Sequence, residues 1–397
     1  MRLLFAHDHR FQRGPAGDLY TLGSFPASVW ERYLEHFENL HVIARDGGAV
    51  SNDSRLARAD REGVTFEFLP SLASPLQLMF PSREVDERMT AAVRAADAVV
   101  ARVPSEIGLL ALRHARRLGK PYAVEVVGCA WDGYLNLGGS AARLYAPLGF
   151  LRMRRAIAKA PLALYVTSAW LQNRYPTNGD WSSASNVYLV PMRAEEGDAR
   201  EARLEALARG QRPVLGTVAS LWVKSKGVQT ALAALSQLRS SGLELTYRVL
   251  GSGPVEPWRR LAESLGVGDL VRFEGTRKAG EGVCRWLDGI DIYLQPSFQE
   301  GLPRGTIEAM SRGAACIGSS CGGIQELLPE DRMHRPGDVA GLASRIRALA
   351  EDPAAIAAAS RADLQKSREF DPDELQARRR EFYARLRAEA DRGAASS

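Results

Sequence analysis

The sequence predicts an α/β protein built from two doubly wound units of similar size. A chain of 397 residues is long enough for two or three domains. Its 45% hydrophobic and 25% charged residues are values typical of a globular protein with sizeable cores. Short apolar runs alternate with amphipathic stretches in two successive series, which is the pattern of parallel strands joined by crossover helices.

The first series fills residues 1–195, which we expect to form the N-terminal unit. Its strands are expected in the short apolar runs 2–6, 40–44, 64–68, 97–101, 121–127, 162–166 and 187–190. Its helices are expected between them, at 26–37, 84–95, 105–117, 140–158 and 168–173.

The charged segment 196–211 has no strand character and is interpreted as a partly helical linker between the units. The second unit covers 212–370, and a last charged helix at 371–391 is expected to pack back on the first unit. Strands of the second unit are expected near 214–219, 245–250, 270–273, 290–295 and 314–318, with helices near 227–239, 255–264, 280–287 and 304–312. Open parallel sheets bind ligands beyond the carboxyl ends of their strands, so the sequence predicts a ligand in a cleft between the units.

Charge and cysteine content exclude several classes of protein. A net charge of +5 is compatible with anionic ligands or an acidic membrane surface. A nucleic-acid binder is disfavoured, because the sequence has no long basic run or basic stripe with interleaved aromatics. The four cysteines show no metal-binding spacing and are interpreted as reduced thiols. No signal peptide or membrane-spanning run is present, so we expect a cytoplasmic protein, at most peripheral at the inner face of the membrane.

Two turns of the second unit contain residues that suit a ligand. The loop WVKSKGV places Lys224 and Lys226 before a helix, where free N–H groups and the helix dipole favour phosphate. A solvated lysine pair beside the turn residue Gly227 is the alternative. In VLGSGP, Gly251 opens a turn that lacks the third glycine and the acid of a dinucleotide fingerprint, so a tight turn explains it as well as a ligand does.

The stretch PSFQEGLPRGTIEAMSRG, residues 296–313, carries the strongest signal. Glu300 falls in the loop after a buried strand, and Glu308 in the first turns of the next helix. The helix N-terminus offers unpaired N–H donors to an anion. Carboxylates beside an anion site are unfavourable unless they bind neutral hydroxyls, and a sugar nucleotide supplies both the anion and the hydroxyls. The alternative is an ordinary helix-start charge and an exposed surface acid.

Together with KGV, VLGSGP, VRFEGT and IGSSCGGIQELL, this stretch resembles the C-terminal domain of the retaining glycosyltransferases of family 4 over about residues 212–330. The specific element is the pair of glutamates separated by seven residues. The resemblance implies the GT-B fold, in which two Rossmann-like domains face each other across a cleft. The stretch YVTSAWLQNRYP is similar to a branch of the family found in bacterial surface-polysaccharide pathways.

The resemblance also implies roles for individual residues. Glu308 would hold the ribose hydroxyls, Glu300 the hydroxyls of the transferred sugar, and Lys226 the phosphates. The sugar and phosphates would be lined by the loop after Glu300, and the nucleobase would be bordered by residues of VRFEGT. The further donor-binding residues are Gly301, Leu302, Pro303, Arg304, Gly251, Gly275 and Thr276.

Three positions depart from the family pattern. Ser220 stands where an arginine usually precedes the lysine, so either Lys224 substitutes or the diphosphate loses one bidentate contact. The glycine-rich turn after the first strand lacks an adjacent glycine pair; a backbone amide at Gly17 would close on the diphosphate, unless the loop is simply long. Gly128 stands where a histidine is usual.

The first unit offers candidates for the acceptor side. His7, Asp8 and His9 are expected at the end of the first strand and suit acceptor or sugar contacts, with His9 as a candidate catalytic residue. The alternative for such a histidine is a structural role. Asp132, four residues after Gly128, is the candidate acceptor-side carboxylate, and the alternative is a turn aspartate that caps a short helix.

The implied reaction transfers a sugar from a nucleotide-diphosphate-sugar to a hydroxyl of a saccharide or lipid-linked acceptor, with retention at the anomeric carbon. No DxD element is present, so neither a metal nor a cofactor is expected. Lys226 and helix N–H groups would stabilise the leaving group, and Glu300 would position the sugar without attacking it. Two alternatives stay open: a sugar-nucleotide epimerase of the same architecture, and a nucleotide-sugar-binding protein with little turnover.

A basic helical stretch at 140–161 bears on membrane association. Its basic residues, which alternate with Leu, Phe and Ala, are Arg143, Arg152, Arg154, Arg155 and Lys159. Such a stretch could rest on anionic lipid, where lipid-linked acceptors lie. The favoured interpretation from sequence is a packed helix with one solvated face.

Overall fold

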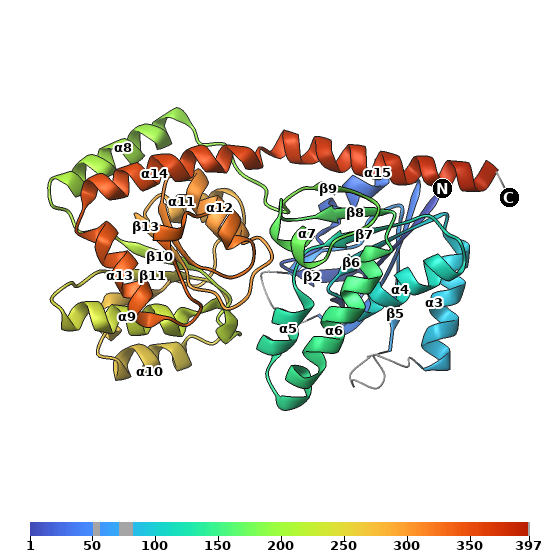
Figure 1. Ribbon diagram of the computed structural model, residues 1–397, viewed down its shortest axis with the longest axis horizontal. Helices are drawn as coiled ribbons and strands as arrows, with labels where there is room; N and C mark the ends of the chain where they lie inside the picture. The colour runs from blue at the N-terminus through green and yellow to red at the C-terminus, as the bar shows by residue number, and fades with distance from the viewer. Residues whose placement is uncertain (51–55, 71–81, 396–397) are drawn as a thin grey trace. The chain divides into compact units, whose positions relative to one another are not determined.

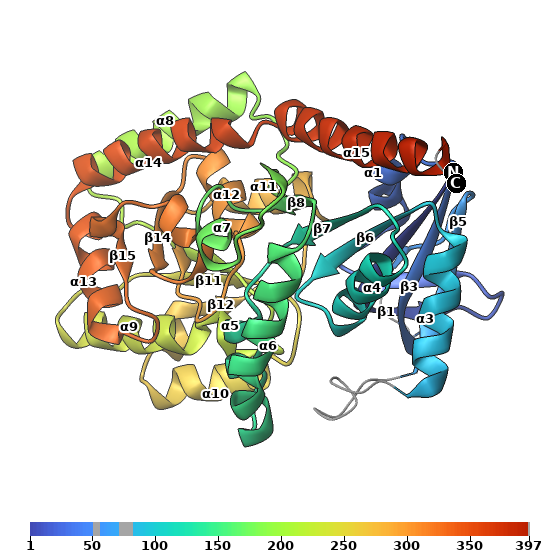
Figure 2. The same ribbon diagram turned by 45° about the vertical axis from the view of Figure 1, so that its right-hand side comes forward.

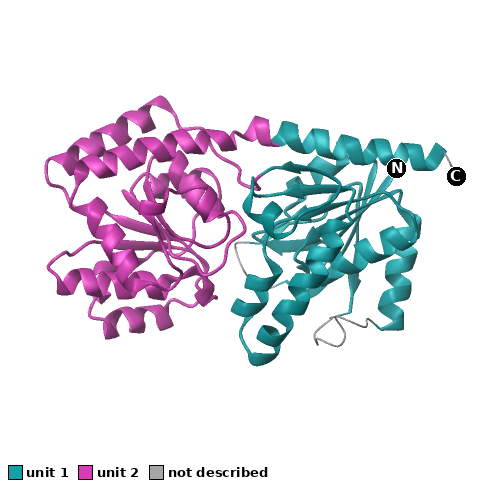
Figure 3. Cartoon of the chain, viewed as in Figure 1, with its two compact units in different colours: residues 1–184, 376–397 teal, residues 185–375 magenta. Residues whose placement is uncertain are grey.

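A computed structural model describes residues 1–50, 56–70 and 82–395 of the chain (Figure 1). The chain forms two compact units (Figure 3): unit 1 comprises Met1–Ala184 and Gln376–Ser397, and unit 2 comprises Ser185–Leu375. Each unit is a parallel sheet with helices on its faces, so the predicted α/β class is confirmed.

Within the described residues, the sheet of unit 1 has seven parallel strands in the order β5-β3-β1-β6-β7-β8-β9. Strand β2 pairs antiparallel with the end of β1, and β4 pairs antiparallel with β2. The strands are β1 (Arg2–Arg13), β2 (Leu19–Leu22), β3 (Asn39–Ala49), β4 (Leu56–Arg58), β5 (Val64–Leu69), β6 (Ala98–Val103), β7 (Tyr122–Val126), β8 (Leu162–Tyr165) and β9 (Asp180–Ser183). The central strands are apolar and buried along most of their length, because helices cover both faces of the sheet.

The helices of unit 1 follow the strands in alternation. They are η1 (Ala27–Trp30), α1 (Glu31–Leu34), α3 (Arg83–Ala95), α4 (Glu106–Arg117), α5 (Ala130–Leu137), α6 (Ser140–Ala158), α7 (Trp170–Arg174) and, from Gln376 onward, α15 (Pro372–Ala395). Two starts are fixed by serine caps: Ser82 accepts a hydrogen bond from Val85 N, and Ser105 accepts one from Gly108 N.

Several elements of unit 1 differ from the sequence prediction, which also lacked β2, β4 and β9. The first strand continues to Arg13, so His7, Asp8 and His9 lie within β1, at a shift in its register with β3. The expected strand at 187–190 is absent. The sheet ends instead at β9, a few residues earlier in the chain. Helix α5 forms in the segment after β7, where the prediction had only a loop.

Unit 2 has a six-stranded parallel sheet in the order β12-β11-β10-β13-β14-β15. The strands are β10 (Leu215–Val218), β11 (Tyr247–Leu250), β12 (Val271–Phe273), β13 (Ile292–Gln295), β14 (Ala315–Ser319) and β15 (Met333–His334). The helices are α8 (Ala194–Ala208), η2 (Lys224–Lys226), α9 (Val228–Ser240), α10 (Glu256–Ser264), η3 (Gly268–Leu270), α11 (Glu281–Leu287), α12 (Arg304–Ser311), η4 (Gly322–Glu326), η5 (Glu330–Arg332), α13 (Val339–Ala350), α14 (Pro353–Ser367) and η6 (Arg368–Phe370). Its core joins the sheet to α9 and α13 (Figure 2), for example through Leu232, Ile292 and Ile346.

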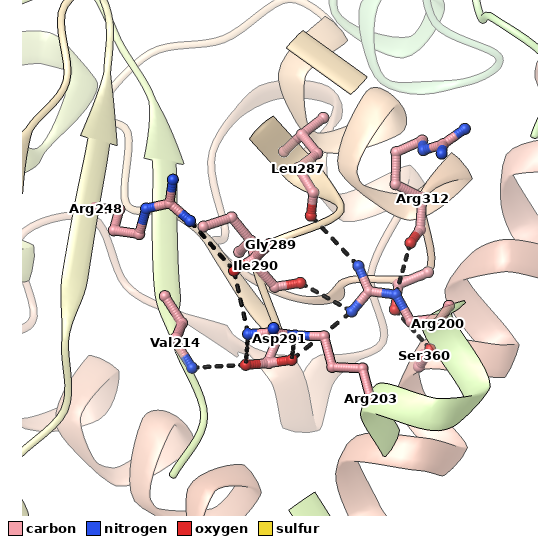
Figure 4. Close-up of polar contacts among 11 residues, drawn as sticks. Arg200, Arg203, Val214, Arg248, Leu287, Gly289, Ile290, Asp291, Arg312 and Ser360 are labelled. Atoms are coloured by element: carbon pink, nitrogen blue, oxygen red, sulfur yellow. Dashed lines mark hydrogen bonds and ion pairs between the residues drawn. The ribbon is translucent and has the colours of Figure 1, made fainter. Parts of the chain in front are cut away.

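Helix α8 belongs to unit 2 and is not a linker, which corrects the interpretation of 196–211. Figure 4 shows the reason: the buried guanidinium of Arg200 donates to the carbonyls of Arg312, Ile290 and Leu287. Arg203 pairs with the fully buried carboxylate of Asp291, at 2.5 Å, just before β13. These contacts fix α8 at the amino edge of the sheet, so the unit begins near Ser185 and not at residue 212.

The C-terminal helix is fixed to unit 1 through a buried carboxylate on β7. Glu125 Oε1 accepts hydrogen bonds from Tyr33 Oη at 2.6 Å and from Tyr383 Oη on α15 at 2.7 Å. Glu125 Oε2 lies 3.5 Å from a guanidinium nitrogen of Arg102. Burial raises the pKa of Tyr383, so the hydroxyl keeps its proton and remains a donor to this carboxylate.

Replacement of Tyr383 by phenylalanine removes the hydroxyl but keeps the ring. We expect a loss of about 1–2 kcal/mol in the free energy of unfolding, because a buried carboxylate loses a donor. Urea unfolding would measure the loss, with Tyr188→Phe as the control, since Tyr188 is 76% exposed. Equal stability of the two variants would contradict the role given to this hydrogen bond.

Candidate functional site

The strand order of unit 2 identifies one position on the sheet that favours ligand binding. From β10 the next strands, β11 and β12, are added on one side of the sheet, and from β13 the next strands, β14 and β15, are added on the other. The chain therefore reverses its direction across the sheet between the neighbours β10 and β13. Ligands of open parallel sheets bind at such a point, beyond the carboxyl ends of the strands. The loop after β10 contains Lys226 and the loop after β13 contains Glu300.

The two loops are joined by their backbones. Phe298 N donates to Ser225 O at 2.7 Å. Gly227 has φ of 75°, and a Cβ there would lie 1.8 Å from the carbonyl oxygen of Pro296. Only glycine meets both conditions, so Gly227 is required for the close approach of the loops and is more than an ordinary turn residue.

Glu300 is buried and its carboxylate is held in one orientation. Its Oε1 accepts from Lys226 Nζ at 2.7 Å, from Ser297 Oγ at 2.7 Å and from Gln295 Nε2 at 2.9 Å. Within the described residues Oε2 accepts no hydrogen bond, so it is available to the hydroxyls of a ligand.

The backbone around Glu300 is fixed from the neighbouring strand. Gly323 N at the start of η4 donates to Gly301 O at 2.7 Å. A Cβ at Gly322, whose φ is 57°, would lie 2.2 Å from the carbonyl oxygen of Glu300. The loop after β14 therefore supports the Glu300 loop directly.

Helix α12 begins at Arg304, after the buried Pro303, and presents its first N–H groups at the carboxyl end of β13. The helix starts close to the sheet, because a Cβ at Gly305 would lie 2.6 Å from Tyr293 Oη. Gly301 and Leu302 form the half-buried turn before it. These free donors are suited to an anion.

Glu308 lies in the second turn of α12 and differs from Glu300 in its surroundings. Burial raises the pKa of Glu308, and the positive charge of Arg304 opposes that shift. In the part of the chain that the structure describes, no side chain donates a hydrogen bond to this carboxylate. A half-buried acid without donors is suited to accept hydroxyl groups of a ligand.

The other predicted donor-site residues of unit 2 lie at the same edge of the sheet. Gly251, after β11, donates its N–H to Gly275 O after β12 at 2.6 Å. Ser220 is half-buried after β10, and Thr276 is exposed after β12. Lys224 is exposed, whereas Lys226 is half-buried against Glu300, so the two lysines of the loop are not equivalent.

In unit 1, Asp8 has a structural role. Its carboxylate accepts from Glu106 N at 2.7 Å and Ile107 N at 3.3 Å, which caps α4, and it pairs with Arg45 at 3.1 Å. His9 Nε2 lies 2.7 Å from Thr21 Oγ1. Burial and the nearby Arg102 lower the pKa of His9 to about 4, so the imidazole is neutral at pH 7.

Asp132 and Gly17 are both placed within unit 1. Asp132 lies in the first turn of α5, 3.7 Å from Arg174, and burial raises its pKa while Arg174 opposes the shift. Gly17 lies in the turn between β1 and β2, with φ of 84°. The turn after the first strand is therefore part of a hairpin. The donor role of Gly17 and the acceptor roles of His9 and Asp132 stay predictions.

Sequence analysis missed the groups that hold Glu300. Gln295 and Ser297 are two positions apart at the end of β13, and Tyr293 Oη donates to Gln295 Oε1 at 3.0 Å. The alternation of a strand puts these three residues on one face, and that signal was present in IYLQPSF. The role of Gly322 depends on a contact between distant loops and left no such signal.

Across residues 1–50, 56–70 and 82–395, no group of three His, Cys, Asp or Glu side chains is placed to hold a metal ion. The groups that the structure brings together at this edge of the sheet are one ammonium, two carboxylates and the free N–H groups of α12.

Comparison with known proteins matches residues 212–352 to the family model described as glycosyl transferases group 1. Protein CapJ of Staphylococcus aureus is 30% identical over 348 residues, covering 87% of this chain and 85% of that protein. The 2-deoxystreptamine glucosyltransferase of Streptomyces kanamyceticus is 31% identical and covers 66% of this chain and 68% of that protein. The amylovoran biosynthesis glycosyltransferase AmsK of Erwinia amylovora is 30% identical over 34% of this chain and 35% of that protein.

Solved structures share the fold over the whole chain. Sucrose-phosphate synthase from Thermosynechococcus elongatus has a TM-score of 0.64 at 17% identity, covering 98% of this chain and 99% of that one. HepE from Anabaena, in complex with UDP-glucose, has a TM-score of 0.61 at 18% identity and covers 100% of both chains. These likenesses identify the two-unit architecture of the GT-B glycosyltransferases.

Proposed function

Because the chain belongs to the glycosyltransferases of group 1, we propose that it is a retaining enzyme of family 4 type. It transfers a sugar from a nucleotide-diphosphate-sugar donor to an acceptor hydroxyl during the assembly of a polysaccharide or glycolipid. The observation that carries this proposal is the arrangement at the β10/β13 edge of unit 2. There Lys226 pairs with the buried Glu300 beside the N-terminus of α12, and Glu308 is left without a donor.

Each group has a distinct task in the proposed reaction. Lys226 and the free N–H groups of α12 neutralise the charge that develops on the diphosphate as the bond to the sugar breaks. Glu300 holds sugar hydroxyls with Oε2, and Glu308 holds the ribose hydroxyls. Preorganisation lowers the barrier, because Lys226 and Glu300 are already held against each other at 2.7 Å.

We assign Glu300 to positioning of the sugar and not to nucleophilic attack. Three donors converge on its Oε1, and these contacts stabilise the carboxylate as a fixed anion. We therefore propose attack by the acceptor hydroxyl on the face from which the phosphate departs, with the leaving phosphate taking the acceptor proton. This gives retention without a covalent intermediate on the protein and without an essential metal.

The substrate class rests on the relatives. AmsK is named for amylovoran biosynthesis, and HepE was solved with UDP-glucose. These names support a nucleotide-sugar donor and a saccharide or lipid-linked acceptor for this chain. UDP is the first candidate for the nucleotide of the donor.

The donor assignment is tested by nucleotide-dependent thermal stability. We expect one of UDP, GDP, ADP and dTDP to stabilise the wild type without magnesium. A nucleotide at about 100 times its Kd adds about 2.7 kcal/mol to the free energy of unfolding. The absence of a shift with all four nucleotides would remove the basis for the donor site.

Product analysis separates transfer from the alternative activities. Incubation of the matching nucleotide-sugar without acceptor should leave the sugar unepimerised, as followed by NMR. With a saccharide acceptor, the new linkage should keep the anomeric configuration of the donor. An inverted product would contradict the retaining assignment, and an epimerised sugar would replace it with an epimerase.

A further inference from the structure

Helix α6 is held to unit 1 by one face only. The buried positions Tyr145, Gly149, Met153 and Ile157 recur every four residues, which defines the inner face. Gly149 lies against the ring of Tyr134 on α5, where a Cβ would be 2.6 Å from the ring. The two helices lie side by side in Figures 1 and 2, with their connecting turn at the lower edge of unit 1.

The inner face is also fixed by a buried carboxylate on α4. Glu106 Oε1 accepts from Tyr134 Oη at 2.7 Å and from Tyr145 Oη at 3.1 Å. Arg152 pairs with Glu106 Oε2 at 2.7 Å. The rotation of α6 about its axis is therefore determined, and one of the basic residues of the helix is used inside the unit.

The opposite face of α6 carries leucines that pack against no core. Leu144 is 85% exposed, Leu148 36% and Leu151 44%. They recur at i, i+4 and i+7 and so form one stripe. Leu137, at the end of α5, is 74% exposed beside the same turn. A single exposed leucine is ordinary, but this hairpin exposes Leu135, at 36%, in addition to these four, which is a concentration of apolar side chains. We call these four residues the leucine face.

The charges around the leucine face all have one sign. The sequence from Gly133 to Lys159 contains no Asp or Glu. Its exposed basic residues are Arg143, Arg154, Arg155 and Lys159. The nearest carboxylates on packed elements are already paired, Glu106 with Arg152 and Asp132 with Arg174. The hairpin is therefore both apolar and cationic on its outer side.

We propose that the leucine face of the α5–α6 hairpin docks on an anionic phospholipid surface. Leucines enter the boundary between headgroups and acyl chains, and the basic residues contact lipid phosphates. Arg155 continues the leucine stripe about 16 Å along the helix from Leu144, so the apolar end lies at the turn and the cationic end follows it. The sequence alone favoured a packed helix; the exposure of the leucines changes that interpretation.

The positive charge around the leucine face also favours an anionic lipid surface over a second copy of the chain. Two such faces would bring eight exposed cations together with no carboxylate between them, which is unfavourable. A phosphate-rich surface satisfies the same charges. No helix of the described residues is long and apolar enough to cross a membrane. The proposal goes beyond the donor site and does not depend on it.

Vesicle co-sedimentation of the full chain tests the proposal. We expect binding to vesicles of phosphatidylcholine and phosphatidylglycerol in a three-to-one ratio, and little binding to phosphatidylcholine alone. Raising salt from about 0.1 M to 1 M should weaken the binding, because the Debye length falls from about 10 Å to 3 Å. No sedimentation with either vesicle, or equal binding to both, would overturn the proposal.

Matched variants locate the surface. The triple change Leu144→Gln, Leu148→Gln, Leu151→Gln should weaken the partition coefficient about tenfold or more. The double change Arg154→Gln, Arg155→Gln should weaken it about fivefold for each charge. Controls are Leu22→Gln, 41% exposed on β2, and the double change Arg378→Gln, Arg380→Gln on α15. Binding by the triple variant that equals that of the controls would overturn the assignment of this face.

Two further measurements separate the test of lipid binding by the leucine face from the test of nucleotide binding at the donor site. Nucleotide-induced thermal stabilisation of the triple variant should equal that of the wild type, which also shows that it folds. Light scattering in solution should find the same mass for both proteins. A wild-type dimer that the triple variant loses would identify a second copy as the occupant and overturn the lipid assignment.

Discussion

Replacement of Lys226 by alanine is expected to lower kcat/KM for sugar transfer by about 10²–10³-fold. In the proposed reaction Lys226 supplies the ammonium that stabilises the leaving diphosphate, and in the structure it is the partner of a buried carboxylate at 2.7 Å. Its loss leaves Glu300 with only the neutral donors Gln295 and Ser297. The measurement is steady-state transfer from the nucleotide-sugar that the stability assay identifies.

The chain offers a matched control two positions away. Lys224 has the same side chain in the same loop, but it is exposed. Lys224→Ala should change kcat/KM by no more than about threefold, which is the effect of one screened surface charge. If the two variants lost activity equally, the loop would act through its general positive charge, and the specific role of Lys226 would be wrong.

The second large effect is expected at Glu308. Replacement by glutamine should weaken nucleotide binding about 10- to 100-fold, because hydrogen bonds from ribose hydroxyls to a charged acceptor are lost. Isothermal titration calorimetry would measure the change. Glu330→Gln, an exposed acid in η5, should bind nucleotide as the wild type does. Wild-type affinity in Glu308→Gln would contradict the ribose assignment.

The thermal stability of the Glu308→Gln variant should change in the opposite direction to its nucleotide affinity. Burial raises the pKa of Glu308 in the folded state, so stability falls as the pH rises from the pKa of the unfolded chain through that of the folded chain. Glu308→Gln should therefore raise the Tm at pH 7 while it weakens binding. In the wild type, nucleotide affinity should fall as the pH drops through a pKa above the ordinary value of 4.5 for glutamate. Loss of both stability and binding in the variant would show that Glu308 is structural.

Much of the fold followed from the sequence by itself. In the parallel sheets, the buried strands contain short apolar runs, as in IYL of β13 and AVVA of β6. The site of unit 2 was predictable for the same reason. Glu300 and Lys226 each follow a recognisable strand, and topology requires those strand ends to meet at one edge.

The tertiary structure decided what depends on contacts between distant segments. The charged segment 196–211 resembles a linker locally, and long-range contacts, such as those of Arg200 with distant carbonyls and of Arg203 with Asp291, make α8 part of unit 2. His9 and Asp8 are polar residues near a strand end in the sequence, but Asp8 caps α4 and burial lowers the pKa of His9.

The leucines of α6 show the same division. Their spacing predicts an amphipathic helix, whose apolar face is normally buried against a core. The sequence cannot say which of two faces is covered, because Tyr145 and Leu144 are neighbours with similar hydrophobic character. The hydrogen bonds of Glu106 turn Tyr145 inward and leave Leu144 exposed. Local pattern thus determined the elements and the chemistry of the donor loops, whereas long-range packing determined which side chains remain free to meet a ligand or a membrane.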